Sequence, residues 1–69
     1  MILEYAIAPT DKAVLLVYDI TGKTISNYYL NASENKININ ENRLDNGVYL
    51  YEIKVNGKTV QSDKLIIIK

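Results

Sequence analysis

Hydrophobic and polar residues alternate most regularly in the last third of the chain. Every second residue from Tyr49 to Val55 is apolar, and Glu52 and Lys54 lie between them. A period of two places the apolar side chains on one face, which is typical of a half-buried β-strand. We therefore predict a strand that begins after the turn at residues 45–47. We expect it to be central, with the other strands registered against it.

The start of this strand has a pattern that is typical of β-sandwiches. Leu44 precedes a turn that contains Gly47, and Tyr49 follows at the beginning of the strand. In a tyrosine corner, the ring of such a tyrosine packs at the end of the sandwich and its hydroxyl bonds the backbone a few residues upstream. The pattern predicts this role for Tyr49.

The first half of the chain predicts three further strands, at residues 2–8, 13–20 and 24–31. Pro9 cannot donate to a β-ladder and so marks a turn after the first of them. The second strand is apolar on both faces, which indicates an interior position or a face that meets a partner. In the third strand, Ile25 and Tyr28 cannot share a face unless a bulge is present.

The second half continues with short strands and tight turns. Residues 36–40 alternate strictly and place Ile37 and Ile39 inward. Asn56-Gly57 is the strongest hairpin motif, because both central residues of a type I′ turn need positive φ. After this turn we predict a strand at residues 58–60, a kink or loop at residues 61–63, and a last strand at residues 64–69.

Together these segments make six or seven short strands, and no stretch has a helical period. The expected fold is all-β, with two packed antiparallel sheets. A chain of 69 residues forms a single domain. A domain of this size buries only about 60% of the surface that its unfolded form exposes. Its net stability should therefore be small, on the order of 3–5 kcal/mol.

The composition excludes several classes of protein and site. Cys and His are both absent, so the chain has no disulfide and no zinc site built from these ligands. Lys and Arg number 8, as do Asp and Glu, and this balance lacks the basic excess of a nucleic-acid-binding module. No apolar run is long enough to cross a bilayer, and no cofactor site is predicted. The N-terminus has no secretory leader pattern, and a strand begins at once, so we interpret the chain as a piece of a larger protein.

Two Gly-Lys-Thr sequences superficially resemble the end of a phosphate-binding loop. That motif needs another glycine five positions before its second one, between a strand and a helix. Val17 and Glu52 occupy those positions, inside predicted strands. Both sequences are therefore interpreted as hairpin turns.

The carboxylates are spread over the chain, and their distribution does not suggest a catalytic pair. Asp19 differs from the rest because, by alternation, it shares a face with Leu15 and Val17. One interpretation is that it caps the turn at residues 21–22 through backbone N–H groups. The alternative, a calcium ligand, lacks a second acid nearby in the sequence. We predict that the protein is not an enzyme.

The chain has six Tyr and neither Phe nor Trp. Such a set could form a sugar-binding platform, but alternation places several of them inward, as core residues with a hydrogen-bonded hydroxyl. Tyr28 and Tyr29 point to opposite faces, so we expect one of them to be exposed.

The chain closes with apolar residues between two lysines: Lys64, Leu65, Ile66, Ile67, Ile68 and Lys69. One interpretation is a buried strand whose charged ends protect against aggregation. The other is a terminal tag that a second protein could add to its own sheet.

Three stretches in order resemble the C-terminal sorting domains of type IX secretion cargo from Bacteroidetes. Residues 17–23 are similar to a hydrophobic-Tyr-Asp-x-x-Gly-Lys hairpin, and residues 44–51 to a Leu-x-x-Gly-Val-Tyr-x-Tyr strand. Residues 56–58, followed by residues 64–69, resemble the end of such a domain. The resemblance covers essentially the whole chain.

The resemblance implies an immunoglobulin-like sandwich that serves as a non-enzymatic sorting signal. The cargo, N-terminal to this domain, would cross the periplasm and the outer-membrane translocon to the cell surface or the medium. A sortase-like peptidase would then remove the domain, often joining the cargo to lipopolysaccharide. Residues 64–69 would engage the translocon. The fold that presents them would depend on turn and corner residues: Asp19, Gly22, Leu44, Gly47, Tyr49, Asn56 and Gly57.

One departure concerns the N-terminus. Family members usually begin with an Asn-Pro-containing segment before the first strand, whereas this chain starts at Met1-Ile2. The leading segment is therefore expected to be missing, and an edge strand left open could allow two copies to pair.

A second function from another class fits the same fold. An immunoglobulin-like adhesion or carbohydrate-binding module, appended to a secreted enzyme, would bind glycans through an exposed Tyr28 or Tyr29.

Overall fold

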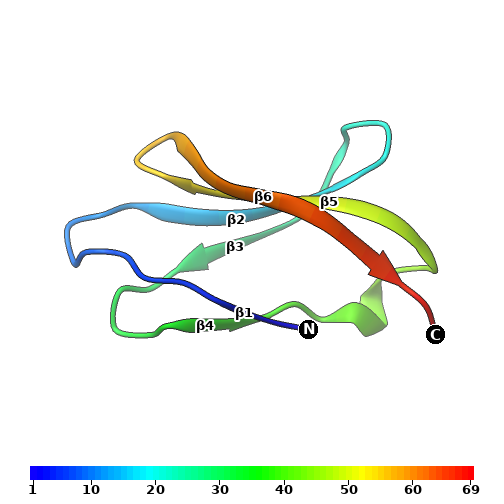
Figure 1. Ribbon diagram of the computed structural model, residues 1–69, viewed down its shortest axis with the longest axis horizontal. Coiled ribbons are helices and arrows are strands. Elements are labelled where there is room, and N and C mark those ends of the chain that lie inside the picture. The colour runs from blue at the N-terminus through cyan, green and yellow to red at the C-terminus, as the bar shows by residue number, and fades with distance from the viewer.

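The computed structural model describes residues 1–69 and contains β-strands, one 3₁₀ turn and no α-helix (Figure 1). The elements in chain order are β1 (Ile2–Glu4), β2 (Ala13–Asp19), β3 (Thr24–Leu30), β4 (Lys36–Asn38), η1 (Glu41–Arg43), β5 (Gly47–Val55) and β6 (Lys58–Ile67). The prediction of an all-β fold is confirmed.

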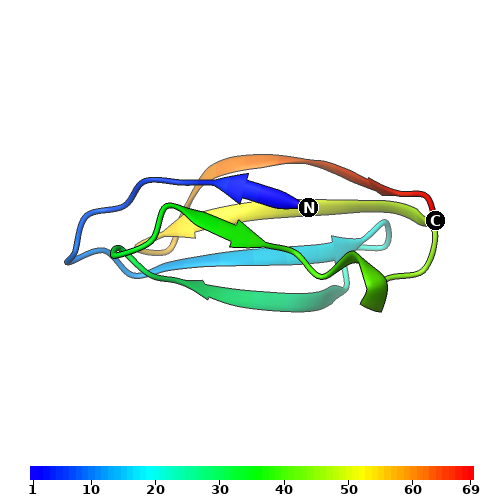
Figure 2. The same ribbon diagram turned by 90° about the horizontal axis from the view of Figure 1, so that it is seen from below.

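The strands form two antiparallel sheets. One has the order β3-β2-β5-β6, and the other consists of β1 and β4. Figure 2 shows β1 and β4 lying over one face of the larger sheet. This arrangement confirms the predicted sandwich of two sheets, while its immunoglobulin-like character stays a prediction.

The predicted interior positions of β2 and β5 are also confirmed. The two strands pair with each other from Ala13 opposite Val55 to Asp19 opposite Tyr49. β3 then pairs with the free side of β2, and β6 with the free side of β5. A strand with neighbours on both sides has its backbone satisfied within the sheet, which suits the apolar sequence of β2.

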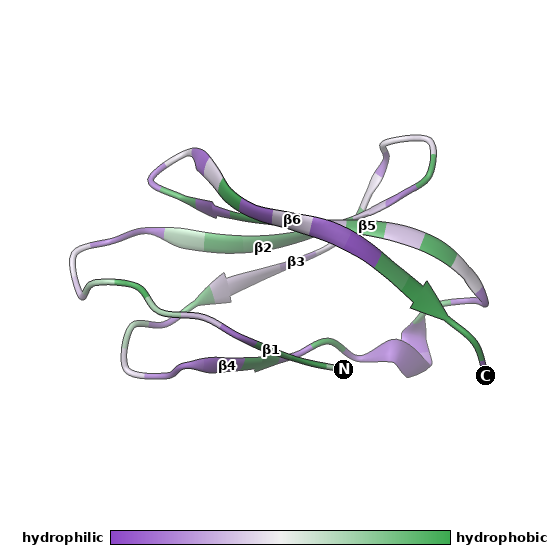
Figure 3. Cartoon of the chain, viewed as in Figure 1, coloured by the Kyte–Doolittle hydropathy of each residue, from purple (hydrophilic) through white to green (hydrophobic).

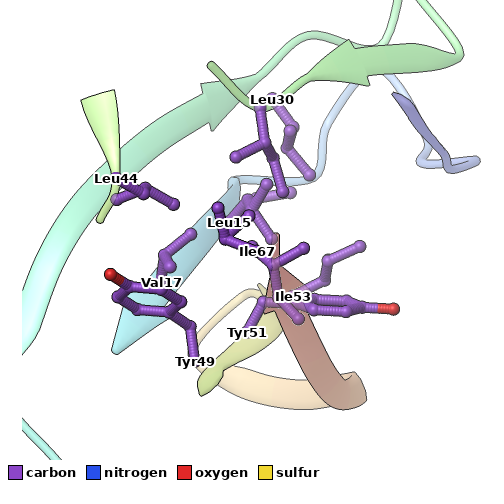
Figure 4. Close-up of a cluster of buried hydrophobic side chains, with 11 residues drawn as sticks. Leu15, Val17, Leu30, Leu44, Tyr49, Tyr51, Ile53 and Ile67 are labelled. Atoms are coloured by element: carbon purple, nitrogen blue, oxygen red, sulfur yellow. The ribbon is translucent and has the colours of Figure 1, made fainter. Parts of the chain in front are cut away.

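The core fills the space between the two sheets (Figure 4). β2 contributes Leu15 and Val17, which have no exposed surface, and β5 contributes every second residue from Tyr49 to Ile53. The remaining buried residues are Ala13, Leu30, Ile39, Leu44, Leu65 and Ile67. The predicted inward face of β5 is therefore correct.

The first strand is shorter than predicted. Only Ile2–Glu4 pair with β4, because β4 itself spans just Lys36–Asn38. Beyond it, the Tyr5 amide still donates to the Asn35 carbonyl oxygen at 2.9 Å. The predicted face is nevertheless right, since Leu3, Tyr5 and Ile7 are half-buried against the core.

The kink or loop predicted at residues 61–63 is wrong, because β6 continues through these residues as one strand. Its ladder with β5 runs without a break from Gln61 opposite Ile53 to Ile67 opposite Gly47. A register shift leaves Val60 as the extra residue of a bulge. The polar residues at 61–63 are exposed on an edge strand, and pairing with β5 keeps them extended.

The third strand contains the bulge that Ile25 and Tyr28 would need to share a face. Val17 pairs with Ser26, whereas Tyr18 pairs with Thr24, so Ile25 is the extra residue. Tyr28 lies opposite Leu15 and is half-buried toward the core, whereas Ile25 is 37% exposed.

The Asn56-Gly57 turn has the predicted stereochemistry. The φ values of Asn56 and Gly57 are +53° and +83°. Asn and Gly tolerate this left-handed region better than other residues, which explains why the hairpin turns here.

Candidate functional site

The candidate functional site is the terminal segment, residues 64–69. It forms the end of β6, which is the edge strand of the larger sheet, and it runs past Ile67 to the chain end. Figure 3 shows that β6 changes from hydrophilic to hydrophobic as it approaches this end.

The structure divides the predicted six residues into two sets. Leu65 and Ile67 are 3% and 1% exposed and belong to the core, whereas Ile66 and Ile68 are 59% and 85% exposed. Lys64 and Lys69 are exposed as well. The alternation of the strand therefore anchors the segment by one face and displays the other.

Polar contacts hold the last residue beyond the end of β6. The backbone amide of Lys69 donates to the Asn46 side-chain oxygen at 2.9 Å. Its ammonium group donates to the Asn42 carbonyl oxygen at 3.2 Å. Sequence reasoning did not assign these asparagines, since nothing local links them to a residue more than twenty positions away.

The tyrosine corner is present next to this segment. The Tyr49 hydroxyl donates to the Asp45 carbonyl oxygen at 2.6 Å, four residues upstream, as predicted. Leu44 is buried. Gly47 lies against the Tyr49 ring, and a Cβ placed on Gly47 would be 3.9 Å from that ring. Tyr49 also pairs with Leu65, so the corner directly supports the terminal segment.

Asp19 caps its turn as the first interpretation predicted. Its Oδ1 accepts from the Thr21 hydroxyl at 2.6 Å, the Thr21 amide at 2.9 Å and the Lys23 amide at 3.0 Å. These hydrogen bonds, the one from the Thr21 hydroxyl above all, lower the pKa of Asp19 because they favour its charged form. Gly22, at a φ of +90°, allows the chain to reverse within the turn.

Asn56 does more than form a turn. Its side-chain oxygen accepts from the Lys12 amide at 3.0 Å, and its side-chain nitrogen donates to Asp11 Oδ1 at 2.9 Å. These contacts connect the β5–β6 turn to the loop that precedes β2. Together with the Ala8 amide, which contributes more, Asn56 lowers the pKa of Asp11.

Sequence reasoning missed a polar cluster on the outer face of the larger sheet. Tyr18 donates to one oxygen of Glu52, and Thr59 donates to the other at 2.8 Å. Lys54 lies 3.6 Å from the same carboxylate. The hydrogen bond from Tyr18 is the main reason that the pKa of Glu52 is lowered and that of Tyr18 is raised. The alternation of β2 and β5 placed Tyr18 and Glu52 on this face, but their proximity depends on the register between the strands.

This cluster borders a shallow cavity of about 310 Å³. The cavity also touches Leu50 and the middle of β6 at Asp63 and Lys64. Both Glu52 oxygens already have donors within the protein. We therefore assign no ligand to it.

The expectation that either Tyr28 or Tyr29 is exposed is confirmed. Tyr29 is 84% exposed, while Tyr28 is half-buried against the core. A second aromatic ring beside Tyr29 on the same face would be needed for a flat sugar-binding platform, and Tyr28 points away from it. Glycan binding has no specific support in this arrangement.

Neither a cluster of metal-ligating side chains nor a membrane-spanning helix is found. No group of three or more Asp or Glu side chains is placed to hold a metal ion. No helix in the structure has the length and apolar character that crossing a membrane requires.

A family model matches nearly the whole chain. It is described as a secretion system C-terminal sorting domain, and it covers residues 3–69. The matched range contains the Asp19 turn, the tyrosine corner, the Asn56 turn and the terminal segment. No curated protein matches the chain significantly, and no solved structure does.

Proposed function

The chain belongs to the family of C-terminal sorting domains of type IX secretion, and on this premise we propose that residues 64–69 are the part that the outer-membrane translocon recognises. Membership makes the domain a sorting signal, and it implies a protein exported to the cell surface or the extracellular space. The family is one of sorting signals and not of catalysts.

The division of the terminal segment supports this proposal. Leu65 and Ile67 hold the strand against the core, while Ile66 and Ile68 present apolar surface to solvent between two lysines. Exposed aliphatic side chains beside positive charges could be recognised by shape, by strand pairing and by charge. No covalent chemistry is required of this domain.

The tyrosine corner and the turn before β5 support the same surface indirectly. Tyr49 lies opposite Leu65, and Asn46 holds the amide of Lys69. We propose that these residues act by presenting the terminal segment in a defined conformation.

The fate of the domain after export is also a proposal. A sortase-like peptidase at the surface would separate it from a cargo domain attached at its N-terminal side. The cargo would then be released or joined to lipopolysaccharide. Mass measurement of an exported reporter would show whether the domain has been removed.

A reporter fusion tests the role of the terminal segment. The domain is fused to a periplasmic reporter in a bacterium with a type IX system, and residues 64–69 are deleted. Surface exposure of the reporter should be lost. A shortened fusion that still reaches the surface would show that recognition lies elsewhere in the domain.

Because the deletion also removes two core residues, a finer pair of variants separates recognition from folding. Ile66→Asp combined with Ile68→Asp changes only exposed side chains and should reduce export strongly. Val60→Asp is the matched control, since Val60 is 62% exposed on the same strand but lies outside the segment. Equal export of the two variants would contradict the assignment.

A further inference from the structure

The outer side of β6 is an unpaired strand edge. β6 lies last in its sheet, and only β5 pairs with it. Its side chains from Lys58 to Lys64 are exposed. An edge strand of ten residues offers a row of free backbone groups to another strand.

Two side-chain contacts identify which backbone groups face this edge. The Lys64 amide donates to Asp63 Oδ1 at 2.7 Å and not to β5. The Lys69 amide points the opposite way, to Asn46 on the β5 side. Because backbone groups alternate in direction along an antiparallel strand, the N–H and C=O groups of Lys64, Ile66 and Ile68 face outward.

Symmetry then restricts how two copies of this edge can pair. If the two copies are related by a two-fold axis perpendicular to the sheet, their edge strands run antiparallel. A given side chain then lies on the same face of the combined sheet in both copies. Residues that lie opposite each other must therefore both be even-numbered or both be odd-numbered. A favourable charge pair across the two strands therefore requires an odd-numbered lysine opposite Asp63. From Lys58 onward, Lys69 is the one lysine with an odd number.

We propose that this edge binds a second copy of the chain, with the two-fold axis at Ile66. Asp63 of each copy then lies opposite Lys69 of the other, and Leu65 opposite Ile67. The outward N–H and C=O groups of Lys64 in one copy hydrogen-bond to those of Ile68 in the other, and the two Ile66 residues lie opposite each other. Placing the axis at Asp63 or at Lys64 would instead set like charges against each other, which is unfavourable.

The same contacts explain why association should be weak. In the single chain, the Asp63 carboxylate accepts a hydrogen bond from the Lys64 amide. Pairing must replace this hydrogen bond with one from the Lys64 amide to Ile68 of the second copy. Pairing over a few residues also buries less area than the roughly 1,200 Å² of a stable interface. The dimer should therefore form at high protein concentration. This inference depends on strand geometry and is independent of the sorting role.

Charge reversal and restoration test the proposed register. Self-association of the domain is measured by sedimentation up to millimolar concentration. Lys69→Glu and Asp63→Lys should each weaken the dimer about tenfold, because two symmetric pairs become repulsive. The double variant D63K/K69E should restore it. Lys58→Glu, the control with the same charge change outside the register, should leave association unchanged.

A backbone variant tests strand pairing independently of charge. Ile66→Pro removes an outward amide that β5 does not use, so it should abolish association while leaving the β5–β6 ladder intact. NMR contacts between Leu65 and Tyr49 would show that the ladder persists. Absence of self-association in the unmodified domain, failure of the double variant to restore it, or association that survives Ile66→Pro would each overturn the proposal.

Discussion

The two ends of the β5–β6 hairpin are held by different physical interactions. At the open end, where β5 begins and β6 finishes, Tyr49, Leu65 and Ile67 are buried in the core. At the closed end, the turn at Asn56 and its neighbours are exposed, and hydrogen bonds connect them to the loop before β2. One backbone ladder, interrupted by the bulge at Val60, thus joins an end stabilised by apolar burial to an end stabilised by polar contacts.

This difference explains how a small domain can present its terminal segment. Apolar burial is the larger contribution to stability, and on β6 it is confined to Leu65 and Ile67, within the terminal segment. The closed end lies far from the segment along the strands, and exposed hydrogen bonds suffice there.

Adjacent isoleucines give the largest expected contrast. Ile67→Ala should cost about 2–5 kcal/mol, because it leaves a cavity beside the tyrosine corner. Ile68→Ala should change stability by less than about 0.5 kcal/mol, because that side chain is in solvent. Urea denaturation of both variants measures the difference. Since the domain itself should be only marginally stable, Ile67→Ala is expected to be largely unfolded, and equal stability would refute the division of the terminal segment.

Two tyrosines on the same face of β5 give a smaller contrast. Tyr49→Phe removes a hydroxyl that donates to the Asp45 carbonyl oxygen at 2.6 Å, and should cost about 1 kcal/mol. Tyr51→Phe is the matched control, because its hydroxyl only accepts a long 3.4 Å contact from Gln61. Denaturant unfolding of the two variants should rank Tyr49→Phe as the less stable. The reverse order would show that the Tyr49 hydroxyl does not stabilise the open end of the hairpin.

The smallest expected effect is the pH dependence at the closed end. Hydrogen bonds from the Ala8 amide and from Asn56 lower the pKa of Asp11 in the folded protein. The resulting stabilisation is present above the pKa of an unfolded aspartate and is lost as the pH falls through the lower, folded pKa. Replacing Asp11 with Asn should therefore flatten this acidic part of the stability profile.

Urea unfolding of both proteins over a pH series measures this change. Asn56→Asp is not a suitable comparison, because it adds a charge to the same contact. Thr21→Ala weakens the cap on Asp19 at a different turn, so its own change in the acid profile should add independently to that of the Asp11 replacement. Identical acid profiles for the Asp11 variant and the unmodified domain would contradict the contact between the loop and the hairpin.

Several parts of the fold and site could be predicted from the sequence. The inward face of β5, the tyrosine corner and the Asn56-Gly57 turn all depend on residues within one short stretch. The Asp19 cap is equally local, since its partners Thr21 and Lys23 lie two and four residues away. Local stereochemistry is sufficient to specify features of this kind.

The predicted loop at residues 61–63 was wrong for the opposite reason. A run of polar residues is compatible with a loop or with an exposed edge strand, and only the presence of β5 beside it distinguishes the two. The Tyr18–Glu52 contact likewise joins residues thirty-four positions apart. No local sequence pattern specifies the register between strands that brings such residues together.

The sequence by itself determined the strand character of the chain, the residues that face inward on β5 and the chemistry of its turns. Only the tertiary structure decided that Leu65 and Ile67 are core while Ile66 and Ile68 are exposed. It also decided that β6 is an edge and that Asn46 holds Lys69. Alternation and turn stereochemistry are properties of neighbouring residues, whereas burial and edge position depend on which distant strands lie alongside.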